Sequence, residues 1–79
     1  MISEDGRWVL VFNGEIYDHE DHRERLEADG VRFRGQSDTE VLLSLIARDG
    51  PEAAVGAVDG MFALAAWDRR DRVLVLARD

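Results

Sequence analysis

Apolar residues run without interruption from position 8 to position 12 and again from position 61 to position 67. A strand that is half in water alternates apolar and polar side chains, whereas an unbroken apolar run is typical of a strand covered on both faces. The sequence therefore predicts a strand from residue 7 to residue 12 or 13, and a second strand over residues 61–67. A third apolar run, residues 73–77, follows the charged segment 68–72. This spacing predicts an antiparallel hairpin with a solvated loop.

The segment after the first strand has the signals of a weakly amphipathic helix. Asp18 can cap this helix, which continues to about residue 29, and Gly30 follows where a C-terminal cap is expected. His19 and His22 lie within it as candidates for a ligand or a base. No cluster of His, Cys or carboxylate residues at metal-ligand spacing accompanies them, and a histidine on a helix is usually solvated. We therefore predict no metal site.

The next segment combines strand and helix signals. Residues 31–34 alternate apolar and basic side chains, which predicts a short, half-buried edge strand. Ser37 and Glu40 fit a capping box, in which the serine oxygen accepts from the N–H three residues on and the glutamate reaches back. The helix that they open carries a strong apolar stripe and continues to residue 48 or 49. A further short helix begins at Pro51, a position at which helices tolerate proline.

Composition narrows the class of protein. The chain has 79 residues, enough for one domain at most, and 46% of them are hydrophobic, which is typical of a globular protein. Asp and Glu number 17 against 10 Lys and Arg, giving a net charge of -7, which argues against nucleic acid or an anionic membrane as a partner. No apolar stretch is long enough to span a membrane. We therefore predict a soluble, cytoplasmic protein.

Asn13 and Gly14 follow the first apolar run, and two interpretations of this pair stay open. Both residues tolerate positive φ, and Asn-Gly is the strongest short-range signal for a hairpin turn. The residues that follow, however, predict a helix and no returning strand. In the second interpretation, the Asn13 side-chain amide and the Gly14 backbone N–H donate to an anionic oxygen, which is the equipment of an oxyanion hole.

Three motifs, taken in order, resemble the glutaminase domain of glutamine-hydrolysing asparagine synthetases. They are NGEIY at residues 13–17, SDTEVLL at residues 37–43, and DGMFA at residues 59–63 followed by WD at residues 67–68. That domain is a class II glutamine amidotransferase of the N-terminal nucleophile hydrolase type. The resemblance covers nearly the whole chain and implies an α+β fold, an αββα sandwich in which mostly antiparallel sheets are packed between helix layers.

The resemblance also implies glutamine as the ligand and assigns roles to four residues. Asn13 and Gly14 would form the oxyanion hole, and Glu15 and Asp38 would bind the α-amino group, so that all four contact the substrate. For Asp38, the pattern alone offers another explanation, because an acidic residue in the first turn of a helix is favoured by the macrodipole. The ATP and Mg of the resembled family belong to a synthetase domain, so no cofactor is expected in this chain.

The sequence contains no cysteine, although the nucleophile of the resembled family is an N-terminal cysteine. Here Met1 is followed by Ile2, so neither that thiol nor the family's arginine for the substrate carboxylate is expected in the chain. We therefore predict that residues 1–79 form a single partial glutamine amidotransferase type 2 domain, lacking the N-terminal nucleophile segment and the C-terminal synthetase domain. Such a chain is expected to be inactive alone and to bind glutamine weakly.

Two functions of different class are consistent with these observations. The chain is a fragment of the ammonia-releasing domain of an asparagine synthetase-like amidotransferase, whose parent reaction transfers the amide nitrogen of glutamine to aspartate with ATP. Alternatively, it is a non-catalytic glutamine-binding or protein-interaction module derived from that domain. Three strands supply little more than one of the two sheets, which predicts an exposed apolar face. We therefore expect a homo-oligomer, or a partner chain that carries the missing segment.

Overall fold

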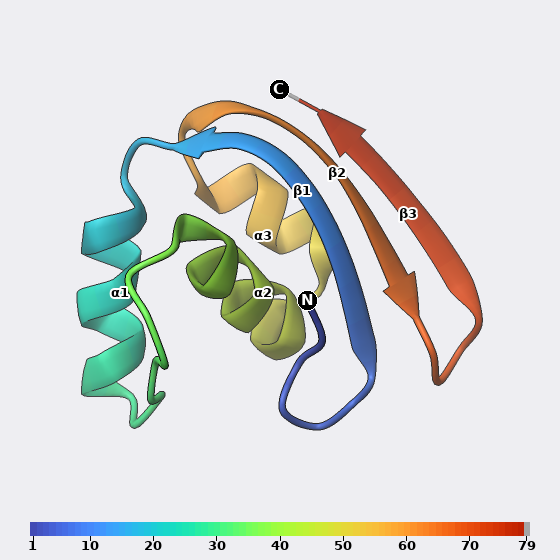
Figure 1. Cartoon of the computed structure of the whole chain (residues 1–79), viewed down its shortest axis with the longest axis horizontal. Helices are drawn as coiled ribbons and strands as arrows, with labels where there is room; N and C mark the ends of the chain where they lie inside the picture. The colour runs from blue at the N-terminus through green and yellow to red at the C-terminus, as the bar shows by residue number, and fades with distance from the viewer. Residues whose placement is uncertain (79) are drawn as a thin grey trace.

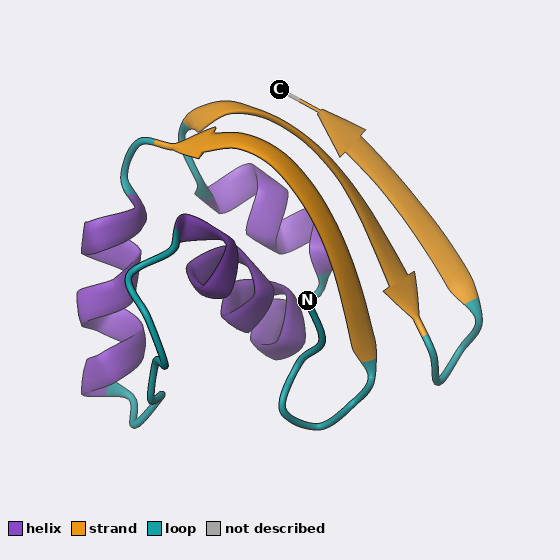
Figure 2. Ribbon diagram, viewed as in Figure 1, coloured by secondary structure: helices purple, strands orange, loops and turns teal. Residues whose placement is uncertain are grey.

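A three-stranded antiparallel sheet lies on a layer of three helices in the computed structural model, which describes residues 1–78 (Figures 1 and 2). The strand order is β1-β2-β3. In chain order the elements are β1 (Trp8–Ile16), α1 (His19–Ala28), α2 (Asp38–Asp49), α3 (Pro51–Ala57), β2 (Gly60–Asp68) and β3 (Val73–Arg78). The α+β class and the β2–β3 hairpin are therefore confirmed. No helix in the described part of the chain combines the length and apolar content needed to cross a bilayer.

β1 continues through Asn13 and Gly14 to Ile16, so the predicted strand end and the alternative of a hairpin turn are both wrong. The strand pairs with β2 over its whole length, with Gly14 opposite Phe62 and Ile16 opposite Gly60. A Cβ on Gly14 would overlap the Met61 carbonyl oxygen, and a Cβ on Gly60 would overlap the carbonyl oxygen of Glu15. The two glycines thus allow β1 and β2 to approach closely. The sequence of β1 taken alone predicts that the strand ends at this point.

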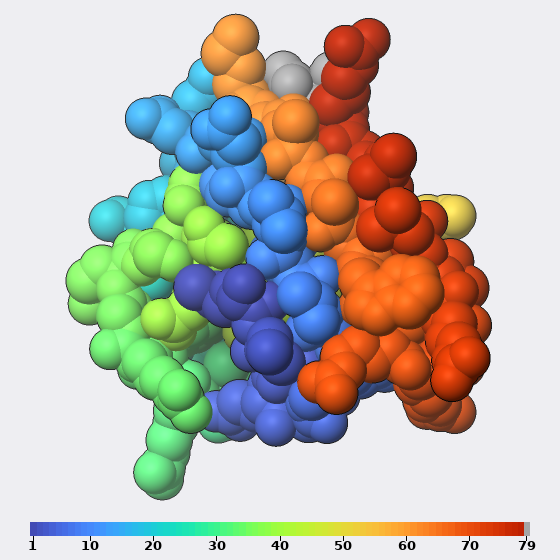
Figure 3. Space-filling model, turned by 45° about the vertical axis from the view of Figure 1, so that its right-hand side comes forward, coloured from blue at the N-terminus to red at the C-terminus, as the bar shows by residue number. Residues whose placement is uncertain are grey.

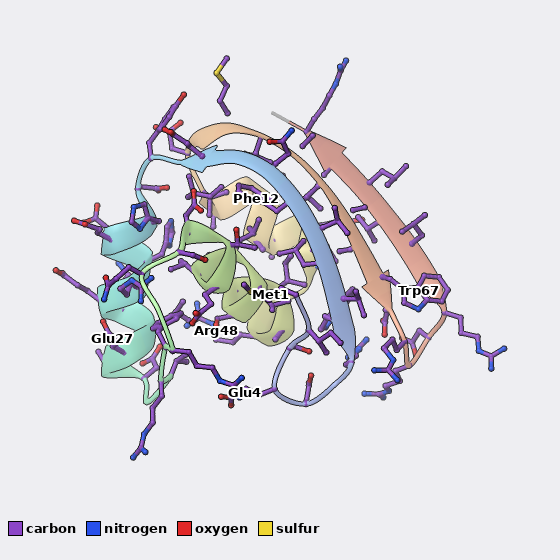
Figure 4. All side chains as sticks on the ribbon, in the orientation of Figure 1. Met1, Glu4, Phe12, Glu27, Arg48 and Trp67 are labelled. Atoms are coloured by element: carbon purple, nitrogen blue, oxygen red, sulfur yellow. The ribbon has the colours of Figure 1, made fainter. Side chains whose placement is uncertain are left out.

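One face of the sheet packs on the helices and forms the core. Leu10 and Ala66 on this face are buried, as are Val41, Leu42 and Ile46 on the stripe of α2 that packs beneath them. Side chains at alternate positions of the strands share this face, since successive residues of a strand point to opposite sides. In Figure 4, Phe12 lies on the side of the helices and Trp67 on the opposite side of the sheet.

The other face of the sheet is open, so the exposed apolar face predicted for a chain with one sheet is confirmed, and the covering expected on both faces of the apolar strands is not supplied within residues 1–78. Figure 3 shows β1, β2 and β3 (blue, orange and red) with this surface uncovered by the helices. The helices pack on one face only, so apolar side chains remain in solvent on the other. Val11 is 68% exposed and Leu76 is 72% exposed; Met61, Trp67 and Leu74 are exposed as well. We call these five side chains the open apolar face.

Residues 31–37 form no regular secondary structure, so the predicted edge strand at 31–34 is wrong. The Val31 N–H donates to the Leu26 carbonyl at 2.9 Å, and the Arg34 N–H donates to Glu40 Oε2 at 2.9 Å. These bonds use backbone donors that strand pairing would need. Ser37 Oγ accepts from the Glu40 N–H at 3.2 Å, as the capping box predicts, but the Glu40 carboxylate contacts the loop instead of reaching back to Ser37.

The charged segment after β2 is anchored by Asp68, which is buried although a solvated loop is predicted there. Arg7, just before β1, donates to it from Nε at 3.0 Å and from Nη2 at 2.8 Å, a bidentate pair. The backbone N–H groups of Arg70 and Asp71 also donate to Asp68. The hydrogen bonds from Arg7 lower the pKa of the Asp68 carboxyl from 3.8 to about 2. Burial alone would raise it.

We expect Asp68→Asn to lower the stability of the chain at neutral pH and to have a shrinking effect as the pH falls below 4. The folded pKa of about 2 lies below the ordinary value of 3.8, so the ionised form is stabilised. This contribution is complete above the ordinary pKa and is lost as the pH falls through the folded pKa. Urea midpoints followed by circular dichroism from pH 7 to pH 2 measure it. Glu24→Gln, at an exposed position of α1, is the control, and a pH-independent effect of Asp68→Asn would contradict the prediction.

Candidate functional site

The outer edge of β1 presents backbone groups that β2 does not use. The Leu10 N–H donates to the Met1 carbonyl at 2.8 Å, and the Ile16 N–H donates to Asp38 Oδ2 at 2.9 Å, both on this edge. Backbone direction alternates along a paired strand, so the N–H of Gly14 faces the same edge as those of Leu10 and Ile16. Within residues 1–78 it has no acceptor there. The edge therefore offers the Gly14 N–H to a ligand.

Asp38 is the first residue of α2, and it is held at that edge by its bond to Ile16. Ser37 is the N-cap of the helix, so the carboxylate follows directly from a fixed helix start. Only Oδ2 of the carboxylate contacts β1, and Oδ1 has no hydrogen-bond partner in the part of the chain that is described. Because Ile16 is two residues beyond Gly14, a carboxylate oxygen and a backbone N–H border the same stretch of edge.

The edge opens into a cleft of about 550 Å³, lined by residues 14–17, His19 and residues 36–38. Gly14, Glu15 and Asp38, three of the four residues predicted for the site, are therefore brought together. Asn13 is not among the lining residues; it is opposite Ala63 and shares the open face of the sheet with Val11. The structure thus places the Asn13 side chain on the open face of the sheet, outside the lining of the cleft.

The charged residues of the cleft favour an ammonium group over a carboxylate. Its lining residues include Glu15 and Asp38 and no Arg or Lys, and the Asp38 carboxylate is held at the edge of β1 by its bond to Ile16. Carboxylates are hydrogen-bond acceptors that stabilise an ammonium group, whereas a ligand carboxylate needs a cationic or N–H partner. The cleft therefore suits an amine and supplies no cation of its own for an α-carboxylate. The four predicted roles themselves stay predictions.

His22 is buried, which corrects the expectation of a solvated helical histidine. Its Nε2 lies 3.0 Å from Asp18 Oδ2 and 3.1 Å from the Ala57 carbonyl, so it joins α1 to α3. Asp18 precedes α1 but makes no side-chain capping bond. Instead it accepts from the Asp59 N–H at 2.9 Å. Burial opposes ionisation of Asp18, but the bonds from Asp59 and His22 outweigh it and lower its pKa.

His19 and Arg23 are two further residues near the cleft whose environment the sequence did not predict. His19 lines the cleft, and its Nδ1 is buried without a partner among residues 1–78. Arg23 is buried under the loop that leads to Asp38. For Arg23, as for His22, the sequence does carry a signal of burial, which is the spacing to Leu26. The two residues precede Leu26 by three and four positions and so share its helix face. No group of three or more His, Cys, Asp or Glu residues in the described chain could hold a metal.

Comparison with known proteins decides the family. The family model described as "Glutamine amidotransferase domain" matches residues 1–79. The chain belongs to this family. The glutamine amidotransferase domain is similar in sequence to asparagine synthetase [glutamine-hydrolyzing] 1 of Bacillus subtilis, with 47% identity over 76 residues, covering 96% of this chain and 12% of that protein. It is also 42% identical over 79 residues to a probable asparagine synthetase of Schizosaccharomyces pombe, covering 100% of this chain and 14% of that protein.

The fold of the domain is shared with solved amidotransferase structures. Glutamine phosphoribosylpyrophosphate amidotransferase from Bacillus subtilis, complexed with ADP and GMP, superposes with a TM-score of 0.80 over 100% of this chain and 19% of that chain. An allosteric regulatory enzyme of purine biosynthesis gives a TM-score of 0.79 over 98% and 18%. Identity is 24% in both cases, so these matches show the fold. The domain spans 12% and 14% of the two curated relatives named above.

Proposed function

We propose that this domain binds glutamine in the cleft at the edge of β1, as the substrate-binding part of a glutaminase in an asparagine synthetase-like amidotransferase. The observation that carries the proposal is the position of the Asp38 carboxylate two residues along the edge from the Gly14 N–H. One group is an acceptor for the ligand's ammonium and the other is a donor for its amide oxygen. The sequence similarity to asparagine synthetases supports glutamine as the ligand.

In the proposed reaction, a thiolate attacks the side-chain amide carbon of glutamine, and the carbonyl oxygen becomes an oxyanion. The Asn13 amide and the Gly14 N–H donate to that oxygen, and loss of one such donor typically costs about 100- to 1,000-fold in rate. The amide nitrogen takes up the proton that the thiol gave up, ammonia leaves as the C–N bond breaks, and water then hydrolyses the thioester to glutamate and the free thiol. The sequence has no cysteine, so the thiol comes from another segment or chain. In the parent protein, a separate domain would use ATP and Mg to transfer the ammonia to aspartate.

A second candidate function is a non-catalytic glutamine-binding or protein-interaction module. It is favoured by the lack of any thiol in the sequence and by the open apolar face, which suits a protein partner. The DNA directly upstream of Met1 discriminates between the two functions. In-frame codons for Met-Cys-Gly would favour the glutaminase, whereas a ribosome-binding site directly before Met1 would favour the module.

Glutamine should bind with a Kd in the millimolar range or weaker and should shift the amide resonances of residues 14–15 and of Asp38. The cleft has no cation for the α-carboxylate, which forfeits about 1.5–3 kcal/mol, or one to two decades in affinity. Titration of the isotope-labelled chain by NMR measures this. N-acetylglutamine, which lacks the ammonium group, is the control and should bind more weakly. The absence of shifts at tens of millimolar glutamine would contradict the proposal.

The isolated chain should self-associate at tens of micromolar through its open apolar face. Exposed apolar side chains share one face of three neighbouring strands, at Val11, Met61, Trp67, Leu74 and Leu76. Such surfaces usually mark sites of association. Sedimentation equilibrium measures the mass, and Leu76→Glu, which places a charge in this face, should shift the chain toward monomer. The prediction is contradicted if the unsubstituted chain is a monomer and binds little hydrophobic dye.

A further inference from the structure

Arg23 of α1 is a buried guanidinium whose charge is not matched by a carboxylate within residues 1–78. The residue is 9% exposed, and its guanidinium carbon lies 4.4 Å from the centroid of the Phe33 ring. Nη1 donates to the Gly35 carbonyl at 2.8 Å and Nη2 donates to the Ser37 carbonyl at 3.2 Å. Nε is buried without a partner in the described chain. Burial of an arginine without an ion pair is costly, so the contacts that it makes need an explanation.

Those contacts all fall on the segment that leads to Asp38. Residues 31–37 have no regular secondary structure, so no strand or helix ladder fixes their carbonyls. Arg23 binds the carbonyls on both sides of Gln36. The Ser37 carbonyl belongs to the peptide unit that joins Ser37 to Asp38. Residues 36–38 form one wall of the cleft, so the guanidinium fixes this wall from behind.

We propose that Arg23 is a positioning residue of the glutamine cleft, an inference that rests on the proposed function. It does not line the cleft. It holds the segment 33–37 so that the Asp38 carboxylate meets the Ile16 N–H at the edge of β1. A planar guanidinium can donate to two carbonyls at once while its face stacks on an aromatic ring. A lysine at this position has the charge without that geometry.

The test compares Arg23→Lys with Arg25→Lys, an exposed arginine on the same helix. Hydrogen exchange at Ile16 reports the bond to Asp38, and exchange at Leu64 in the central strand reports global stability. In Arg23→Lys, protection of Ile16 should fall at least about tenfold more than protection of Leu64, because a charge-assisted bond is lost. Arg25→Lys should change neither. An equal fall at both amides, or none at Ile16, would overturn the proposal.

Two further measurements keep the test decisive. Phe33→Leu removes the stacked ring and leaves the arginine in place, so it should show the same exchange pattern to a smaller degree. It decides the question if Arg23→Lys is too unstable for exchange measurements. The glutamine response of Arg23→Lys should weaken at least about tenfold if the cleft wall moves. Exchange at Ile16 needs no ligand. If the unsubstituted chain does not respond to glutamine, that result counts against the proposed function. The exchange pattern at Ile16 still decides the role of Arg23.

Discussion

Gly14→Ala should leave the chain without a cooperative unfolding transition. Gly14 has a φ of 131°, and an added Cβ would lie 2.6 Å from Phe62 Cα as well as overlapping the Met61 carbonyl oxygen. Both obstacles are backbone atoms of the central strand, so no side chain can rotate away. Backbone strain together with such overlap costs about 3 kcal/mol or more. A single small core supplies no more than about 3–5 kcal/mol, so the substitution consumes most of the stability.

Circular dichroism during urea denaturation measures this, with Gly56→Ala as the matched control. Gly56 lies in α3, and a Cβ there meets nothing within 4 Å. Since alanine favours a helix more than glycine does, Gly56→Ala should raise the stability by about 0.5–1 kcal/mol. If Gly14→Ala has a urea midpoint near that of the unsubstituted chain, β1 and β2 can separate locally. That result would refute the steric argument.

The glycine at position 14 therefore has a structural cause that is independent of catalysis. The close approach of β1 and β2 requires Gly14, and Gly60 opposite Ile16 answers the same requirement from the other strand. The proposed oxyanion role depends instead on the direction of the Gly14 N–H, which faces the unpaired edge. The glycine of the Asn-Gly motif is explained by packing alone, and the edge geometry is the observation that adds a function to it.

Local signals in the sequence predicted most elements of the fold. The capping serine at position 37, the apolar stripe of α2, the proline that opens α3 and the hairpin after residue 68 are all set by residues within a few positions of one another. The end of β1 was missed because it depends on Gly60, which is distant in sequence. The edge strand predicted at 31–34 does not form, because Glu40 and Leu26 bind the backbone donors of that segment.

The site was predictable in its residues but not in its arrangement. Family resemblance pointed to Asp38, whereas its bond to Ile16 joins residues 22 positions apart and is visible only in the fold. The burial of Arg23 depends on a loop with no periodic pattern, so hydrophobicity along α1 could not reveal it. Asn13 illustrates the reverse case. Its position in the motif suggests a place inside the cleft, yet strand alternation puts its side chain on the open face.

Asp38→Asn and Asp38→Ala should separate the two explanations for this residue. Asparagine keeps an oxygen that can accept from the Ile16 N–H, and it removes the charge. If Asp38 binds the ammonium group of glutamine, Asp38→Asn should abolish the glutamine-induced shifts, since loss of a charge-assisted bond lowers a millimolar affinity by about 10- to 100-fold. Its stability should fall by only about 0.3–1 kcal/mol, the usual contribution of an acidic residue to a helix N-terminus.

Asp38→Ala should lose the glutamine response as well, and should also lose about 1–3 kcal/mol of stability, because the Ile16 N–H is left without its acceptor. Urea denaturation and NMR titration of both variants, with Asp49→Asn at the exposed far end of α2 as the control, measure the two effects side by side. Unchanged glutamine shifts in Asp38→Asn would mean that the carboxylate serves only the helix and the strand edge. Equal stability of the two variants would mean that the bond to Ile16 contributes nothing to the fold.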